Sequence, residues 1–157
     1  MVLTLPNQAP PNTHAERPET IATSALADAL SSVGDRWTLL IVAALLDHPS
    51  RFGDLQRDLG GIAPNVLSGR LQKLEQQGLV VAEAYQERPP RFFYELTDSG
   101  RALAGPLRLL ADWGARHAGG AEPPVHAVCG TTLEATWYCP SCQAPVADDE
   151  ASDLHFA

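Results

Sequence analysis

The sequence contains few cysteines and no long hydrophobic run, and these absences exclude several classes of protein. Only three cysteines occur among 157 residues, and all three follow Gly119. An odd number of cysteines argues against a closed disulfide framework. Without a run of about 18 apolar residues, the chain has no candidate membrane-spanning helix. Residues 1–18 hold four prolines and lack the signal-peptide pattern of a basic region followed by an apolar stretch. We therefore expect a cytoplasmic protein without a membrane partner.

Motifs typical of common enzymes are missing as well. The sequence has no glycine-rich phosphate loop, no nucleophile elbow and no paired His-Glu metal motif. We therefore expect a protein that is not an enzyme.

Positive charge is scarce overall, but the acidity is unevenly distributed. The formal net charge is −8, and residues 120–157 contain six acidic residues and no lysine or arginine. Residues 20–119 contain ten basic and eleven acidic residues. Because phosphate affinity depends on the local field of one face, this near balance is compatible with a basic surface in the middle of the chain. We divide the chain into a flexible N-terminal arm (1–19), a folded domain (20–119) and a C-terminal tail (120–157).

Apolar residues at helical spacing predict two helices at the start of the folded domain. The first covers Thr20 to Val33, and Gly34 interrupts it. Asp35 is well placed to cap a second helix from Arg36 to Leu46, which is apolar on nearly all sides. A helix of that kind lies in the middle of a core.

A short helix and a longer one follow. An extended piece at Arg51-Phe52 leads into a predicted helix from Gly53 to Leu59, and Gly60-Gly61 forms a turn. Pro64 suits the first position of a helix that continues to about Gln77. Two helices joined by a glycine turn are typical of a helix-turn-helix.

Two strands and a last helix complete the domain. Leu79 to Tyr85 and Phe92 to Leu96 read as strands, and the loop Gln86 to Arg91 between them is longer than a two-residue turn. A helix from about Asp98 to His117 should be kinked or split by Pro106. The order predicts a mainly α fold with a small β-hairpin, a winged helix-turn-helix flanked by one extra helix at each end.

Four aromatic residues of this region are expected in the core rather than on a base-stacking surface. Trp37 opens the buried helix, and alternate residues of the strand from Phe92 to Leu96 must pack inward. The four are Trp37, Phe52, Phe92 and Phe93.

Several of these segments resemble, in the same order, the motifs of HxlR-type winged helix-turn-helix regulators. The run from Asp35 to Ile41 is similar to the family's GDRWTLLIL motif, and three later segments resemble further motifs, namely Phe52 to Leu55, Ile62 to Val80 and Pro89 to Thr97. The resemblance covers about residues 25–118. It implies a transcription regulator, taken here as a repressor, whose terminal helices pair in a homodimer and whose two heads bind a pseudo-palindromic duplex.

The sequence departs from the family pattern at two places. Ala63-Pro64-Asn65 stands at the start of the longer helix, where the family usually has a serine and then a polar or basic pair. The operator sequence is therefore not carried over. The N-terminal redox cysteine of some members has no counterpart before Cys129, so that mechanism is not carried over either.

The helix from Pro64 to Gln77 is the predicted recognition helix, which enters the major groove with its N-terminal half. Asn65 is suited to pair with adenine, and Arg70 with guanine or a phosphate. The loop arginines sit beside two stiffening prolines and are placed for the minor groove or the backbone. The predicted DNA-binding residues are Arg51, Pro64, Asn65, Ser68, Gly69, Arg70, Gln72, Lys73, Arg88 and Arg91. The alternative is that these are ordinary solvated residues of a protein-interaction module.

The tail contains two short pairs of metal-ligand residues. His126 and Cys129 form one pair, Cys139 and Cys142 form the other, and nine residues separate the pairs. One histidine and three cysteines make a closed tetrahedral zinc site, so we predict a structural, zinc-ribbon-like tail with a hairpin between the pairs. His117 or His155 is an alternative to His126, and a redox-active dithiol at the second pair is the rival interpretation.

A small-molecule effector is a further hypothesis. Its pocket would lie between the terminal helices and the winged core and would include residues such as Trp113.

Overall fold

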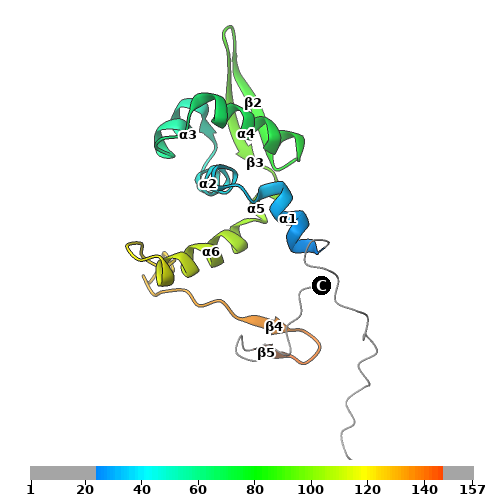
Figure 1. Ribbon diagram of the computed structural model, residues 1–157, viewed down its shortest axis with the longest axis vertical. Helices are drawn as coiled ribbons and strands as arrows, with labels where there is room; N and C mark the ends of the chain where they lie inside the picture. The colour runs from blue at the N-terminus through cyan, green and yellow to red at the C-terminus, as the bar shows by residue number, and fades with distance from the viewer. Residues whose placement is uncertain (1–23, 147–157) are drawn as a thin grey trace, which may run out of the picture.

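The computed structural model describes residues 24–146, which form a winged head, two outer helices and an extended tail (Figure 1). The N-terminal arm predicted for residues 1–19 lies outside the described residues, as do residues 147–157. Within the described part, no helix is long and apolar enough to cross a membrane.

The head begins with the buried helix that the sequence predicts. Helix α1 covers Ala25–Val33, and α2 covers Arg36–Leu45. Asp35 caps α2, because its Oδ1 accepts hydrogen bonds from the backbone N–H groups of Trp37 and Thr38, both at 3.2 Å. This cap satisfies two donors that the first turn of a helix leaves without partners.

The helix-turn-helix follows with nearly the predicted bounds. Strand β1 (Ser50–Arg51) leads into α3 (Phe52–Asp58), and α4 covers Pro64–Gln76 with its proline in the first turn. The chain leaves α4 at Gly78, whose φ of +67° is a conformation that glycine adopts without strain.

The wing is a hairpin in a three-stranded antiparallel sheet of order β1-β3-β2. Strand β2 covers Val80–Glu87 and β3 covers Pro90–Leu96, so only Arg88 and Pro89 lie between them. The predicted six-residue loop is therefore wrong. The strands continue to their ends because Gln86 pairs with Arg91 and Glu87 with Pro90, beyond a register shift near Ala84.

The last predicted helix is split, as Pro106 suggested. Helix α5 (Asp98–Arg101) is separated from α6 (Ala104–His117), which places the proline in the first turn of α6. Pro106 costs little there, because a first-turn N–H has no partner within the helix.

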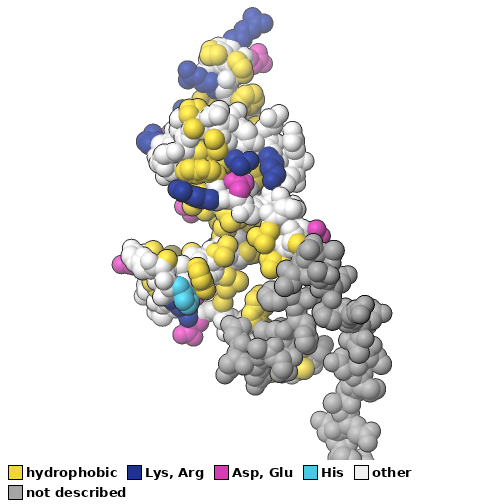
Figure 2. All heavy atoms as spheres, in the orientation of Figure 1, with side chains coloured by type: hydrophobic (Ala, Val, Ile, Leu, Met, Phe, Trp, Pro, Cys, Tyr) yellow, Lys and Arg dark blue, Asp and Glu magenta, His cyan; other side chains and the backbone are white. Residues whose placement is uncertain are grey.

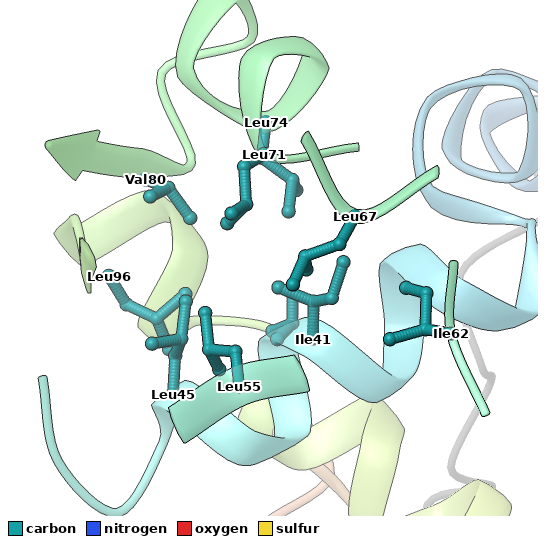
Figure 3. Close-up of a cluster of buried hydrophobic side chains, with 10 residues drawn as sticks. Ile41, Leu45, Leu55, Ile62, Leu67, Leu71, Leu74, Val80 and Leu96 are labelled. Carbon is teal, nitrogen blue, oxygen red and sulfur yellow. The ribbon is translucent and has the colours of Figure 1, made fainter. Parts of the chain in front are cut away.

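A compact aliphatic core holds the head together (Figure 3). The labelled side chains come from α2, α3, α4, the preceding turn and the two long strands, and they point toward one another. Trp37 and Phe52 pack against this core, as expected. The fully or nearly fully buried members are Ile41, Val42, Leu45, Leu55, Ile62, Leu67, Leu71, Leu74, Val80 and Leu96.

The tail does not form the single hairpin that the sequence predicted. Val125 makes one antiparallel bridge with Thr132, while β4 (Trp137–Cys139) pairs with β5 (Ala144–Val146) as a separate ribbon. In Figure 1 the orange segment before β4 runs back beneath α6 and separates the two turns. The residues between the ligand pairs are extended instead of folded back.

Candidate nucleic-acid interface and tail

The polar face of α4 is uncovered. Leu67, Leu71 and Leu74 anchor the opposite face in the core. With 3.6 residues per turn, residues three or four apart share one face of the helix, so the intervening positions point away from the core. The outward positions Asn65, Ser68, Gly69 and Gln72 are all exposed, as the sequence reasoning required.

A groove runs between the first turns of α4 and the wing. Its volume is about 750 Å³, and α3, β1, α4 and both long strands contribute to its wall. The structure brings five of the predicted DNA-binding residues together here, namely Arg51, Pro64, Asn65, Ser68 and Arg91. The two predicted elements of the interface, helix and wing, therefore share one concave surface.

Arg51 is held at this groove by two aromatic rings. Its guanidinium lies 4.7 Å from the ring centre of Tyr85 and 4.8 Å from that of Phe93. The two rings also contact each other, with centroids 4.8 Å apart. Stacking occupies the flat faces of a guanidinium but leaves its N–H groups at the edge free to donate.

Phe92 is a residue whose placement the sequence reasoning missed. The prediction of a core position is wrong, because the side chain is 37% exposed and lines the groove. The core prediction is wrong for its neighbour Phe93 as well, because this half-buried ring packs on Tyr85 and Arg51 and not on the aliphatic core. Alternation along the strand places Phe92 on the same face as Tyr94 and Leu96, which do pack at the core, so alternation alone does not indicate that Phe92 is exposed.

Arg70 and Lys73 have partners inside the protein. Arg70 Nε donates to Asp35 Oδ1 at 2.9 Å, and Lys73 Nζ donates to the carbonyl oxygen of Ser31 at 3.3 Å. Partial burial opposes the ionised form of Asp35, but hydrogen bonds from Thr38 and the charge and hydrogen bond of Arg70 outweigh it, so its pKa lies below the ordinary value. These two basic residues fasten α4 to α1 and α2.

The wing carries exposed positive charge. Arg88 lies in the two-residue turn, where the side chain of Gln86 donates to its carbonyl oxygen at 2.9 Å, and Arg91 lies on β3. Figure 2 shows dark blue Lys and Arg side chains at the tip of the wing and over the upper half of the molecule. Glu87, the last residue of β2, is an acidic neighbour of this turn.

The first ligand pair of the tail is already assembled. His126 Nδ1 lies 3.3 Å from Cys129 Sγ. The backbone N–H of Gly130 donates to the carbonyl oxygen of His126 at 2.7 Å, and Gly130 adopts a φ of +71°. Hydrogen bonds from Thr131 and then from His126 lower the pKa of Cys129 to about 7. This geometry is a tight turn that points both side chains the same way.

The second pair lies at the end of the β4–β5 ribbon. The backbone N–H of Cys142 donates to Cys139 Sγ at 3.5 Å, and this bond from Cys142 is the main reason why the pKa of Cys139 is lowered. Cys139 in turn raises the pKa of Cys142. Among residues 24–146, however, no three His, Cys, Asp or Glu side chains come close enough to hold one ion.

An open cavity of about 350 Å³ separates α6 from the extended tail segment. Leu109 and Asp112 line it on the helix side, and Leu133 and Trp137 on the tail side. Trp113 is not part of its wall; it is 61% exposed and stacks on His117. The cavity therefore lies elsewhere than in the effector hypothesis.

Comparisons with known proteins agree with this architecture. A model of the HxlR-like helix-turn-helix family matches residues 32–122. YtfH of Escherichia coli, an HTH-type transcriptional regulator, is 40% identical over 86 residues, which is 55% of this chain and 68% of YtfH.

Two solved structures extend the likeness to three dimensions. The crystal structure of the transcription factor PA1607 has a TM-score of 0.71 and 30% identity, and the match covers 87% of this chain and 96% of PA1607. The oxidised form of the redox regulator HypR has a TM-score of 0.55 and 28% identity, over 59% of this chain and 95% of HypR. The chain therefore belongs to the HxlR-like helix-turn-helix family, whose members are transcriptional regulators and not enzymes.

Proposed function

We propose that the protein is a homodimeric repressor that binds a pseudo-palindromic site in duplex DNA. The uncovered polar face of α4, sharing one groove with the wing, is the observation that carries this proposal. A groove of this shape suits a duplex in which α4 occupies the major groove and the wing lies over the adjacent backbone.

The proposed contacts divide into two kinds. Asn65 and Ser68 in the first turns of α4 face the bases, while Arg51, Arg88 and Arg91 face phosphates or the minor groove. Gly69 and Gln72 continue the helix face, and Pro64 starts it. Arg70 and Lys73 act mainly by holding α4 in place, through Asp35 and Ser31.

The outer helices supply the dimer surface in this proposal. Leu30 of α1 and Leu110 and Trp113 of α6 are each more than half exposed. Figure 2 shows yellow hydrophobic side chains along α6. A second copy of the chain would remove this apolar area from water and set two α4 helices on successive turns of DNA.

The tail is proposed to hold one structural zinc ion per chain, through His126, Cys129, Cys139 and Cys142. The paired turns described above favour this donor set. Four protein ligands leave no open position, so this zinc would order the tail and carry no reaction. Measuring the zinc content of the purified protein tests this proposal, and a variant in which all four ligands are replaced is the control.

A thiol switch is a second candidate function, favoured by the adjacent sulfurs of Cys139 and Cys142 and by the likeness to the redox regulator HypR. Oxidation of these thiols to a disulfide would release any metal they hold. If Cys139→Ser/Cys142→Ser abolishes a change in DNA affinity upon oxidation, the switch is supported. If oxidant has no effect on the wild type, it is excluded.

Selection of bound duplexes from a random pool tests the DNA-binding proposal. We expect an inverted repeat whose half-sites are centred about one helical turn apart. A reporter behind that repeat should be repressed in cells that express the protein. Enrichment of no sequence, or of a single half-site, would contradict the proposed symmetric complex.

A further inference from the structure

The two ligand pairs of the tail are ordered but incomplete. The first pair has its donor atoms 3.3 Å apart. A tetrahedral zinc ion, with bonds of about 2.0 Å to nitrogen and 2.3 Å to sulfur, places those atoms about 3.5 Å apart. The first turn therefore has the shape of half a zinc site, and neither pair meets a third ligand within the described part of its own chain.

The segment between the pairs holds them apart. Leu133 and Trp137 lie opposite Leu109 and Asp112 across the cavity beside α6. The backbone N–H of Leu133 donates to the carbonyl oxygen of Pro124 at 2.9 Å, which joins the two ends of the turn that holds the first pair. The pairing of Cys139 with Ala144 joins the two ends of the turn that holds the second pair. The tail thus carries one half-site at each end of an extended run along the outer helix (Figure 1).

Two-fold symmetry offers a direct way to complete both halves. In a symmetric dimer, if surface i of one subunit meets surface j of the other, then j also meets i. When a two-fold axis passes between the middles of two extended segments, the segments run antiparallel. The N-terminal end of one segment then lies beside the C-terminal end of the other. The segments run beside α6, across the cavity from Leu109 and Asp112, and α6 is the helix proposed to form the dimer surface.

We propose that each zinc ion is shared between two subunits, bound by His126 and Cys129 of one chain and by Cys139 and Cys142 of the other. The dimer holds two such sites. This inference rests on the proposed homodimer and adds that the metal joins the subunits. Zinc would then join the tails of the two subunits and stabilise the pair of winged heads as one unit.

The likeness to PA1607 is consistent with an extended tail. The first 119 residues make up about three quarters of the chain, whereas the match with PA1607 covers 87% of it at a TM-score of 0.71. The match therefore reaches into the tail. The family model ends at residue 122, so the likeness to PA1607 extends beyond the segment that the family model matches.

Two heterodimers distinguish a shared site from a site within one chain. In the first, His126→Ala/Cys129→Ser pairs with Cys139→Ser/Cys142→Ser. In the second, wild type pairs with the variant that lacks all four ligands. Each full-length heterodimer is purified through two different peptide tags without histidine, and its zinc is measured by mass spectrometry.

The two arrangements predict opposite results. A shared site gives one zinc in the first heterodimer, from the two intact halves that meet, and none in the second. A site within one chain gives none in the first and one in the second, and this result would overturn the inference. Two zinc ions in the wild-type dimer and none in either variant homodimer are the required references.

The same preparations separate this inference from the proposed function. If the wild type is a monomer, no heterodimer forms and the homodimer proposal itself fails. If the wild type is a dimer without zinc, the metal proposal fails while the dimer stands. Circular dichroism of each variant checks that the winged head is folded, which we expect because every residue of its buried core lies between Ile41 and Leu96.

Discussion

At the scale of single residues, Asp35 has two structural roles. It caps α2 and accepts a hydrogen bond from Arg70, so it links the buried helix to α4. We expect Asp35→Ala to lower the free energy of unfolding by about 1–2 kcal/mol, mostly from the lost cap. Denaturant unfolding measures this loss. Ser31→Ala, at an exposed position of α1, is the control and should change stability by less than about 0.5 kcal/mol.

The stabilisation from Asp35 should depend on pH. Because the pKa of Asp35 is lower in the folded protein, its contribution to stability is fully present above the ordinary aspartate pKa of 3.8 and is lost as pH falls through the folded pKa. The stability difference between wild type and Asp35→Asn should therefore be constant near neutrality and should shrink below about pH 4. A difference that grows upon acidification would contradict this account.

Gly100 is required by a close approach. A Cβ atom there would lie 2.2 Å from the carbonyl oxygen of Leu79, which is backbone and cannot move aside easily. Gly100→Ala should cost about 1–3 kcal/mol of stability, as overpacking does. Gly69→Ala is the matched control, because nothing lies within 4 Å of its added Cβ.

Gly69→Ala also tests the DNA interface. Alanine in an exposed helix interior should raise stability by up to about 1 kcal/mol. If the backbone of α4 approaches the duplex closely at this point, the same change should weaken DNA binding several-fold. Unchanged DNA affinity would remove Gly69 from the proposed interface.

At the scale of elements, the arginines of α4 and of the wing should behave differently. Arg91→Ala should reduce DNA affinity by about 10-fold or more, as loss of a charged contact does, and leave thermal stability nearly unchanged. Arg70→Ala should instead lower stability, because it leaves Asp35 without its cation. Parallel anisotropy titrations and thermal melts separate the two effects. Equal loss of DNA affinity at unchanged stability would show that Arg70 contacts DNA directly.

Local patterns predicted most elements of this fold from the sequence. The spacing of Leu67, Leu71 and Leu74 predicted α4, and Pro106 predicted the break before α6. The extent of the wing was not predictable, because Glu87 and Pro90 lack the apolar alternation of a strand and pair only through the backbone. The partners of Arg70 and Lys73 depend on how α4 packs against α1, a tertiary fact that spacing does not contain.

The tail shows the same limit of sequence reasoning. The spacing of His126, Cys129, Cys139 and Cys142 indicated two ligand pairs, and both turns exist. A hairpin between them was inferred from β-forming residues. The segment instead runs beside α6, across an open cavity from Leu109 and Asp112, and the spacing of the ligand residues does not contain this path.

At the scale of the whole molecule, the apolar outer helices should control assembly. Leu110→Glu places a charge on an exposed apolar position of α6 and should shift the protein from dimer to monomer. Val81→Glu adds the same charge to an exposed position of β2 and should leave the dimer intact. Sedimentation equilibrium measures both. A dimer that tolerates Leu110→Glu but not Val81→Glu would place the interface on the sheet.

The central claim is that α4 and the wing, presented twice by a dimer, bind duplex DNA. The most direct measurement is the affinity for a selected palindromic duplex as a function of salt between 50 and 200 mM, for wild type and for Arg51→Ala/Arg91→Ala. We predict that affinity falls steeply as the salt concentration rises. In a plot of the logarithm of the binding constant against the logarithm of the salt concentration, the slope of the double variant should be shallower by about two per subunit. An affinity insensitive to salt, or an unchanged slope in the variant, would contradict the claim.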